Sequence, residues 1–164
     1  MEGVNALLEF DVKIEAGDLY DYMLRHSYNS ASGIIGSCFG ALLVVLAVGT
    51  GQWLYLVFGL IILLYLPWTL FIRSRKQILT NASFQQPLHY MLDEEGLTIS
   101  QGEDSVKYLW EEVHKAVSTS RSIILYTSPV NATIFPKRQL EDKKAALIEM
   151  ISTHVSPGKV KIRS

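Results

Sequence analysis

Residues 33–48 read GIIGSCFGALLVVLAV and residues 53–72 read WLYLVFGLIILLYLPWTLFI. Both runs lie in a segment, His26 to Ile72, that contains no Asp, Glu, Lys or Arg, so all 15 basic and 16 acidic residues of the 164-residue chain lie outside it. A 20-residue helix rises about 30 Å, the thickness of the hydrocarbon core of a bilayer. The sequence therefore predicts two membrane-spanning helices rather than one uniformly soluble domain.

A buried hairpin inside a soluble helical protein is the alternative. Both runs are apolar on every side of a helix, and the remaining polar segments are too short to cover two such helices. The link at residues 49–52 is short and uncharged, which predicts a tight antiparallel hairpin.

The orientation of the hairpin follows from the basic residues at its ends. Arg25 precedes the first run, three basic residues follow the second, and the link has none, so the positive-inside rule places both termini in the cytoplasm. Aromatic residues at both ends of the second run suit the membrane interfaces. The expected interfacial anchors are Arg73, Arg75, Lys76, Trp53 and Trp68.

Gly36 and Gly40 form a GxxxG pattern in the first helix. Small residues let membrane helices approach closely. Packing against the partner helix around Gly59 is the interpretation we favour, and homodimerisation is the alternative.

The polar segments read as a small α+β domain. Residues 8–14 alternate between apolar and charged side chains, as a half-buried strand does, and Asp18 can cap a short helix to about Ser27. After the hairpin, the period of two predicts six antiparallel strands, followed by a helix from about Glu141 to His154. The expected strands are 88–92, 97–101, 105–110, 113–118, 123–126 and 132–135.

If the N-terminal strand joins that sheet, the seven strands and closing helix match the inventory of a pleckstrin-homology-like (PH-like) domain, with the hairpin inserted after the first strand. A curled sheet packed on a helix fits the same strand count. The expected division is 1–28 for the cytosolic strand and amphipathic helix, 29–76 for the hairpin (spans at about 31–49 and 53–73), 77–156 for the sheet domain and 157–164 for a basic tail.

Four short segments carry a family resemblance: Leu92-Asp93-Glu94-Glu95-Gly96-Leu97, Trp110-Glu111-Glu112-Val113, Ile123 to Tyr126, and Ile134-Phe135-Pro136-Lys137-Arg138. Together they resemble the YcxB-like family, over roughly residues 88–153. The resemblance implies a bacterial cell-membrane protein with a C-terminal YcxB-like, PH-like domain. It implies no catalytic residue, cofactor or ligand.

A search for catalytic or metal-binding motifs finds none. The four histidines lack metal-ligand spacing, the single Cys lies in the first apolar run, and nucleotide-binding and hydrolase motifs are absent. The near-zero net charge gives no argument for nucleic-acid binding. We therefore expect a protein that is not an enzyme and needs neither cofactor nor metal.

Trp110, Lys137 and Arg138 are the candidate binding residues. Trp110 ends an alternating strand and reads first as a core residue. Lys137 and Arg138 follow Pro136 and read first as solvated cations at a turn, or else as a contact for an anion or a lipid headgroup.

The expected function is a membrane-anchored cytosolic binding or regulatory module, contacting a membrane protein, a peptide or anionic lipid. The alternative is a small oligomeric hairpin protein, such as a pore, a transporter subunit or an immunity protein. The lipid bilayer is a partner in both, with a membrane protein or a second copy as the further partner. The apolar runs contain no ionisable Asp, Glu, Lys or Arg, which disfavours a membrane hydrolase.

Overall fold

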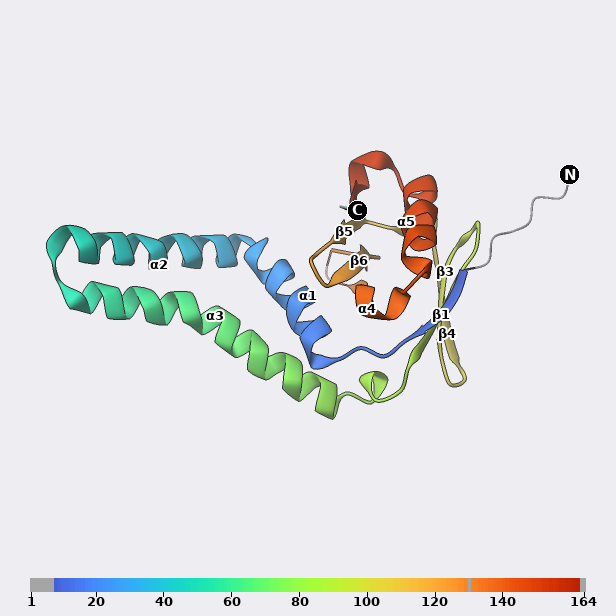
Figure 1. Cartoon of the computed structure of the whole chain (residues 1–164), viewed down its shortest axis with the longest axis horizontal. Coiled ribbons are helices and arrows are strands. Elements are labelled where there is room, and N and C mark those ends of the chain that lie inside the picture. The colour runs from blue at the N-terminus through green and yellow to red at the C-terminus, as the bar shows by residue number, and fades with distance from the viewer. Residues whose placement is uncertain (1–7, 130, 163–164) are drawn as a thin grey trace, which may run out of the picture.

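A computed structural model describes residues 8–129 and 131–162. The chain forms a domain of strands and short helices from which a long helical hairpin projects (Figure 1). Of the segments discussed above, residues 1–7, Val130, Arg163 and Ser164 lie outside the described residues.

The helices and strands follow the expected order with two differences, at the C-terminal helix and at the tail. The elements are β1 (Leu8–Val12), α1 (Ala16–Tyr28), α2 (Ala31–Thr50), α3 (Trp53–Thr80), β2 (Leu88–Leu92), β3 (Gly96–Gln101), β4 (Asp104–Leu109), β5 (Lys115–Ser118), β6 (Ser122–Tyr126), β7 (Ala132–Pro136), α4 (Lys137–Leu140), α5 (Lys143–His154) and β8 (Val160–Lys161). Short 3₁₀ turns occupy Ala82–Phe84, Trp110–Glu112 and Pro157–Lys159.

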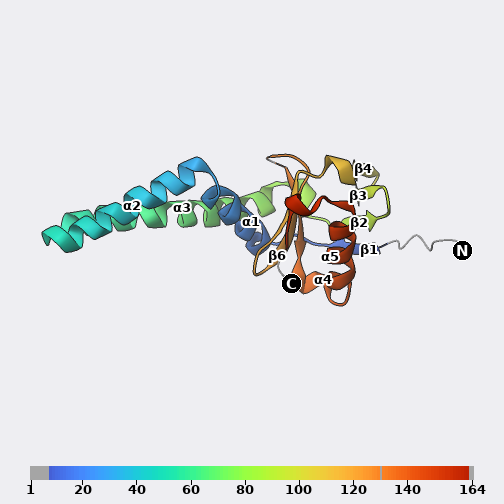
Figure 2. The same cartoon turned by 90° about the horizontal axis from the view of Figure 1, so that it is seen from above.

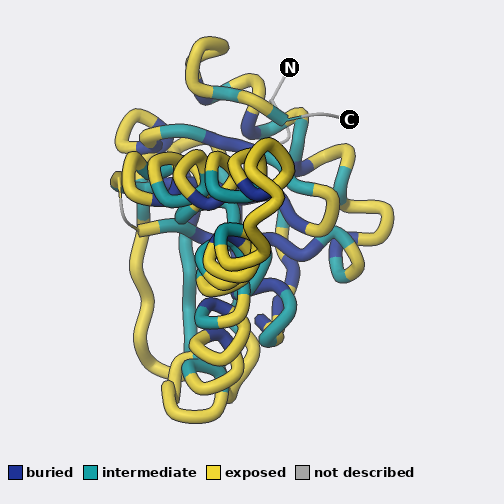
Figure 3. Tube along the Cα trace, turned by 90° about the vertical axis from the view of Figure 1, so that its left-hand side faces the viewer, coloured by how far each residue is buried: buried dark blue, intermediate teal, exposed yellow. Residues whose placement is uncertain are grey.

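The hairpin consists of α2 and α3, two helices that by length and composition can cross a membrane. Gly51 ends α2 with a φ of 70°, a left-handed conformation that suits glycine. Only 17% of the most apolar stretch of α2 and 11% of that of α3 is buried, and the hairpin is mostly exposed in Figure 3. The chain therefore does not use these helices as the core of a soluble domain.

Two glycines bring α2 and α3 into close contact. A Cβ atom added at Gly40 would lie 2.8 Å from Cγ of Leu63, and one at Gly59 would lie 2.9 Å from the carbonyl oxygen of Gly40. Gly36 differs, because a Cβ atom there would meet nothing within 4 Å. Within the chain, Gly40 and Gly59 therefore serve helix packing and Gly36 does not.

The first sheet has the order β1-β2-β3-β4, with antiparallel neighbours. Leu8 pairs with Leu92 and Val12 with Leu88, so the expectation that the N-terminal strand joins the sheet is confirmed. Because β1 and β2 are adjacent, α1 and the hairpin are an insertion between two paired strands.

The second sheet has the order β7-β6-β5-β8. Its first three strands are antiparallel, and β8 is parallel to β5 with Ala116 opposite Val160. The tail expected at 157–164 thus contains a short edge strand, which has too few residues for a period to be recognised in the sequence.

The core lies between the two sheets and α5 (Figure 2). Fully buried side chains come from β1, β2, β6 and β7, while Leu147 and Ile151 of α5 close the domain. The helix expected from Glu141 begins earlier, at Lys137, and is interrupted at Glu141, whose φ is 44°. A helix cannot continue through this backbone conformation, so α4 and α5 are separate.

The contact between Gly40 and Leu63 predicts different outcomes for the two glycines of the GxxxG pattern. Gly40→Leu forces the helices apart and should destabilise the protein by about 1–3 kcal/mol, whereas Gly36→Leu should change the stability by less than about 0.5 kcal/mol. Thermal unfolding of both variants in detergent measures the difference. Equal destabilisation would contradict this account of the hairpin.

Candidate functional site

Helix α1 lies between the hairpin and the second sheet (Figure 1). On one side the ring of Tyr20 meets that of Phe71 in α3 edge to face, with centroids 5.8 Å apart. On the other side, Tyr22 and His26 pack against Tyr126 of β6 at 6.0 and 6.3 Å. Every residue of β6 is buried, because the core covers one face of the strand and α1 covers the other.

The N-terminus of α1 differs from the sequence expectation. Asp18 was expected to cap the helix, but Glu15 is the capping residue and Asp18 is the third residue of the helix. The two form a reciprocal capping box, in which the amide of Glu15 donates to Oδ2 of Asp18 at 2.9 Å. The helix therefore starts one turn earlier than the Asp18 cap implied.

Asp18 is almost fully buried, with a relative exposure of 1%, and pairs with Arg138. Both guanidinium nitrogens donate to the carboxylate, Nη2 at 2.9 Å from Oδ2 and Nη1 to Oδ1. Arg138 also lies 3.2 Å from Glu15. The hydrogen bond to Asp18 and the two negative charges raise the pKa of Arg138, which stays charged.

The neighbouring Lys137 is also engaged within the chain. Its Nζ atom donates to the carbonyl oxygen of Thr119 at 2.5 Å, and its backbone amide to that of Arg121. Thr119 in turn donates to Asp21 of α1. The segment after Pro136 thus holds α1 on the second sheet, a structural role for both candidate cations.

The sequence predicted that Trp110 ends a strand. In the structure it begins a 3₁₀ turn. Its side chain is buried, stacks on His154 of α5 with centroids 5.4 Å apart, and donates from Nε1 to the carbonyl oxygen of Asp93 at 2.9 Å. The turn at Asp93 is itself fixed, because Oδ1 of Asp93 accepts from the amides of Glu95 and Gly96. These contacts give Trp110 a role in the core.

Of the expected interfacial anchors, Trp53 begins α3, Trp68 lies near its middle, and the three basic residues lie in its last third. Trp53 and Trp68 are about two-thirds exposed. Arg73 and Lys76 line a groove of about 420 Å³ between α1 and α3, while Arg75 lies 4.7 Å above the ring of Phe71.

A basic cavity of about 560 Å³ lies between the end of α1, β5 and the C-terminal segment. Its cations are Arg25, Lys115, Lys159 and Lys161, and no Asp or Glu is among the described residues that line it. The remaining lining residues are His26, Asn29, Ser30, His114, Val117, Tyr126, Pro129 and Gly158. We call this site the basic cavity.

Tyr126 lies at the wall shared by the basic cavity and α1. The pKa of Tyr126 is raised, because burial and the neighbouring Tyr22 outweigh the lowering effect of Arg25. Lys115 lies 4.4 Å above the same ring, and Nζ of Lys159 donates to the carbonyl oxygen of Val113. The cations therefore come from three separate parts of the chain and face one volume.

In the sequence, the cations of this cavity are basic residues scattered along the chain, with no sign that they form one site. The alternation of Lys159 and Lys161 was visible as a basic tail, but the tail becomes part of a site only because β8 pairs with β5. Arg25 had been assigned to topology alone. No local signal places Lys115 or His114 beside them.

No group of three or more His, Cys, Asp or Glu side chains that could hold a metal ion occurs in residues 8–129 and 131–162. His89 contacts two carboxylates across the β1–β2 pair, with Nδ1 2.7 Å from Asp11 and Nε2 3.0 Å from Glu9. All three side chains are at least one-third exposed on the sheet surface.

The fold class is α+β. Two sheets, antiparallel except for the β5–β8 pair, are closed by a helix, and two apolar helices are inserted between β1 and β2. The model of the family described as YcxB-like protein matches residues 92–151, which confirms the resemblance over the segment from the end of β2 into α5. The match does not include β1, α1 or the hairpin. No curated protein and no solved structure matches the chain significantly.

The buried pair predicts a large effect at Arg138. Arg138→Gln leaves the Asp18 carboxylate buried without a cation and should lower the free energy of unfolding by about 2–3 kcal/mol. The double variant with Asp18→Asn should be more stable than Arg138→Gln alone, because the buried charge is then gone. Denaturant titrations in detergent measure both, with Lys144→Gln as the control. Simple additivity of the two substitutions would contradict the pairing.

The Asp93 turn predicts a pH dependence. Partial burial raises the pKa of Asp93, but hydrogen bonds from Gly96, Glu95 and Lys107 outweigh it, so the pKa lies below its ordinary value. The stabilisation is therefore complete above the unfolded-state pKa of about 4 and is lost as the pH falls through the folded-state pKa.

We accordingly expect Asp93→Ala to lower the free energy of unfolding by about 1 kcal/mol at pH 7, with the difference from wild type shrinking below about pH 4. Thermal unfolding across pH 3–8 measures it, and Glu103→Ala in the next turn is the control. A difference that stays constant over this range would show that the carboxylate charge has no part in the turn.

Proposed function

We propose that this protein is a two-helix membrane protein that holds a non-catalytic, PH-like binding domain at the cytoplasmic surface of a bacterial cell membrane. The observation that carries the proposal is the position of α1, which contacts α3 on one side and β6 on the other. A domain joined to its anchor in this way keeps a fixed distance and orientation relative to the membrane.

The membrane assignment is supported by the surface of the hairpin. Ile35, Val45, Leu64 and Trp68 are each more than 60% exposed, although water is a poor solvent for such side chains. A bilayer removes this surface from water without a partner protein. The family match adds support for the domain but not for the hairpin, since it begins at Leu92.

The PH-like assignment is supported by the topology. Four strands form one sheet, three consecutive strands form most of a second, and a C-terminal helix closes the space between them. In this interpretation the hairpin lengthens the connection between the first two strands, and the edge strand β8 is an addition.

The orientation is supported by charge. Arg25 precedes α2, while Arg73 and Lys76 lie in the last two turns of α3, on the same end of the hairpin as the domain. The positive-inside rule then places the domain in the cytoplasm. The binding role is supported by the basic cavity, which offers a charged, partly enclosed volume of the size of a small-ligand site.

The alternative, an oligomeric hairpin that acts as a pore, transporter subunit or immunity protein, has weaker support. Its motivation was the pair Gly36 and Gly40, and Gly40 packs against Leu63 of the same chain. Only Gly36 stays available for contact with a second copy.

The topology can be tested by labelling single cysteines. In a Cys38→Ser background, Gln52→Cys in the loop should react with a membrane-impermeant maleimide in intact bacterial cells with a permeable outer layer. Glu149→Cys on α5 should react only after lysis. The protein should also stay in the membrane pellet at alkaline pH. Labelling of Glu149→Cys in intact cells, or release of the protein from the pellet, would contradict the proposal.

A further inference from the structure

We infer that the basic cavity binds the phosphate of an anionic phospholipid headgroup, and that one acyl chain of the same lipid lies in the groove between α2 and α3. This inference rests on the proposed membrane anchoring and identifies the ligand class of the proposed binding domain. Three features support it: the unpaired charge of the cavity, its position, and an adjacent groove between α2 and α3.

The charge of the cavity is not neutralised within the described part of the chain. None of Arg25, Lys115, Lys159 and Lys161 forms an ion pair with a described carboxylate, whereas Lys107 and Arg138 each contact two. Four cations that face one volume repel each other, and a bound anion converts this repulsion into attraction. Phosphate oxygens accept charge-assisted hydrogen bonds from Arg and Lys side chains.

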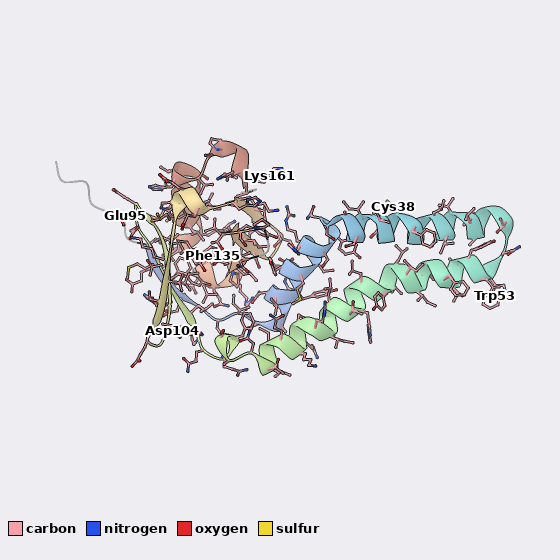
Figure 4. All side chains as sticks on the ribbon, turned by 180° about the vertical axis from the view of Figure 1, so that it is seen from behind. Cys38, Trp53, Glu95, Asp104, Phe135 and Lys161 are labelled. Atoms are coloured by element: carbon pink, nitrogen blue, oxygen red, sulfur yellow. The ribbon has the colours of Figure 1, made fainter. Side chains whose placement is uncertain are left out.

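The position of the cavity matches the depth of lipid headgroups. Asn29 and Ser30 line it, and α2 starts at Ala31, so the cavity lies beside the first residues of an apolar helix. Figure 4 shows Lys161 on the side of the domain from which the hairpin projects, while Glu95 and Asp104 lie on the far side. Cations close to an anionic leaflet contribute about tenfold in affinity for every one or two residues.

A second cavity lies next to the first, at the start of the hairpin. Ser30 lines both the basic cavity and a groove of about 270 Å³ between α2 and α3. Besides serine and tyrosine residues, this groove is lined by Gly36, Ile62, Leu63 and Leu66, and a Cβ atom at Gly36 would meet nothing within 4 Å. The missing side chain of Gly36 thus leaves space for an acyl chain. A free phosphate ion would use only the basic cavity, so the groove favours a lipid.

The test uses the full chain in nanodiscs of equal amounts of phosphatidylcholine and phosphatidylglycerol, with native mass spectrometry to count the lipids retained. Wild-type protein should retain phosphatidylglycerol in preference to phosphatidylcholine. Lys115→Gln with Lys161→Gln should reduce this retention by about tenfold or more. The matched control, Lys13→Gln with Lys144→Gln, makes the same charge change away from the cavity and should retain the lipid as wild type does.

Two single variants test the same site in case the lysine double variant fails to fold. Arg25→Gln, on α1, should lower the retention of phosphatidylglycerol about fivefold without the lysine changes. Gly36→Leu should lower it by filling the groove. The thermal shift produced by inorganic phosphate is measured in parallel with that produced by short-chain phosphatidylglycerol.

Equal retention of the two lipids, or equal behaviour of the two lysine double variants, would overturn the inference. A thermal shift from inorganic phosphate as large as that from the short-chain lipid, with no effect of Gly36→Leu, would show a site for free phosphate and would overturn the lipid assignment. Release of the protein from membranes at alkaline pH contradicts the proposed function itself. Retention in the membrane without lipid preference contradicts only this inference.

Discussion

The architecture depends on a carboxylate that is removed from water. Asp18 is 1% exposed, and its oxygens are satisfied there because Arg138 donates to both of them and the amide of Glu15 donates to Oδ2. An unpaired carboxylate at this position would cost several kcal/mol. The pair therefore joins the first turn of α1 to the start of α4, and the orientation of α1 on the second sheet is set by a charged contact as well as by apolar packing.

The position of α1 decides how the two halves of the protein relate. Its Tyr22 and His26 cover β6, its Tyr20 contacts α3, and its last residues lead directly into α2. Because β1 and β2 are paired neighbours, the insertion returns to the sheet from which it leaves. The hairpin is thus attached through both of its ends, and α1 contacts both the hairpin and the second sheet. The basic cavity lies at this junction, where Arg25 and His26 of α1 form part of its lining.

Elements with a clear local period could be predicted from the sequence. The alternation in residues 8–14 identified β1, and the charge-free runs identified α2 and α3, because a half-buried strand and a continuous apolar helix each leave a pattern in consecutive residues. The limits of the strands differ by one or two residues, as at β5, which begins at Lys115 and not at Val113. The interruption at Glu141 was missed, since a single backbone conformation leaves no periodic signal.

The candidate site was less predictable, because its contacts join distant residues. Arg138 and Asp18 are 120 positions apart. In the sequence, Arg138 has the position of an ordinary turn cation and Asp18 that of an ordinary helix cap. The basic cavity forms only because β8 pairs with β5. This pairing could not be predicted, since a strand of two residues is too short to show a period. Residues 73–164 contain 13 basic and 10 acidic residues, but only the fold shows which of the basic ones face one volume.

Hydrogen–deuterium exchange of the intact protein in nanodiscs tests the central claim most directly, because it compares α1 with the elements on both sides of it. If α1 joins the hairpin to the second sheet, the amides in the middle turns of α1 exchange as slowly as those of β6, and Arg138→Gln speeds both. Rapid exchange throughout α1 beside a protected β6 would show a flexible linker and would contradict the account.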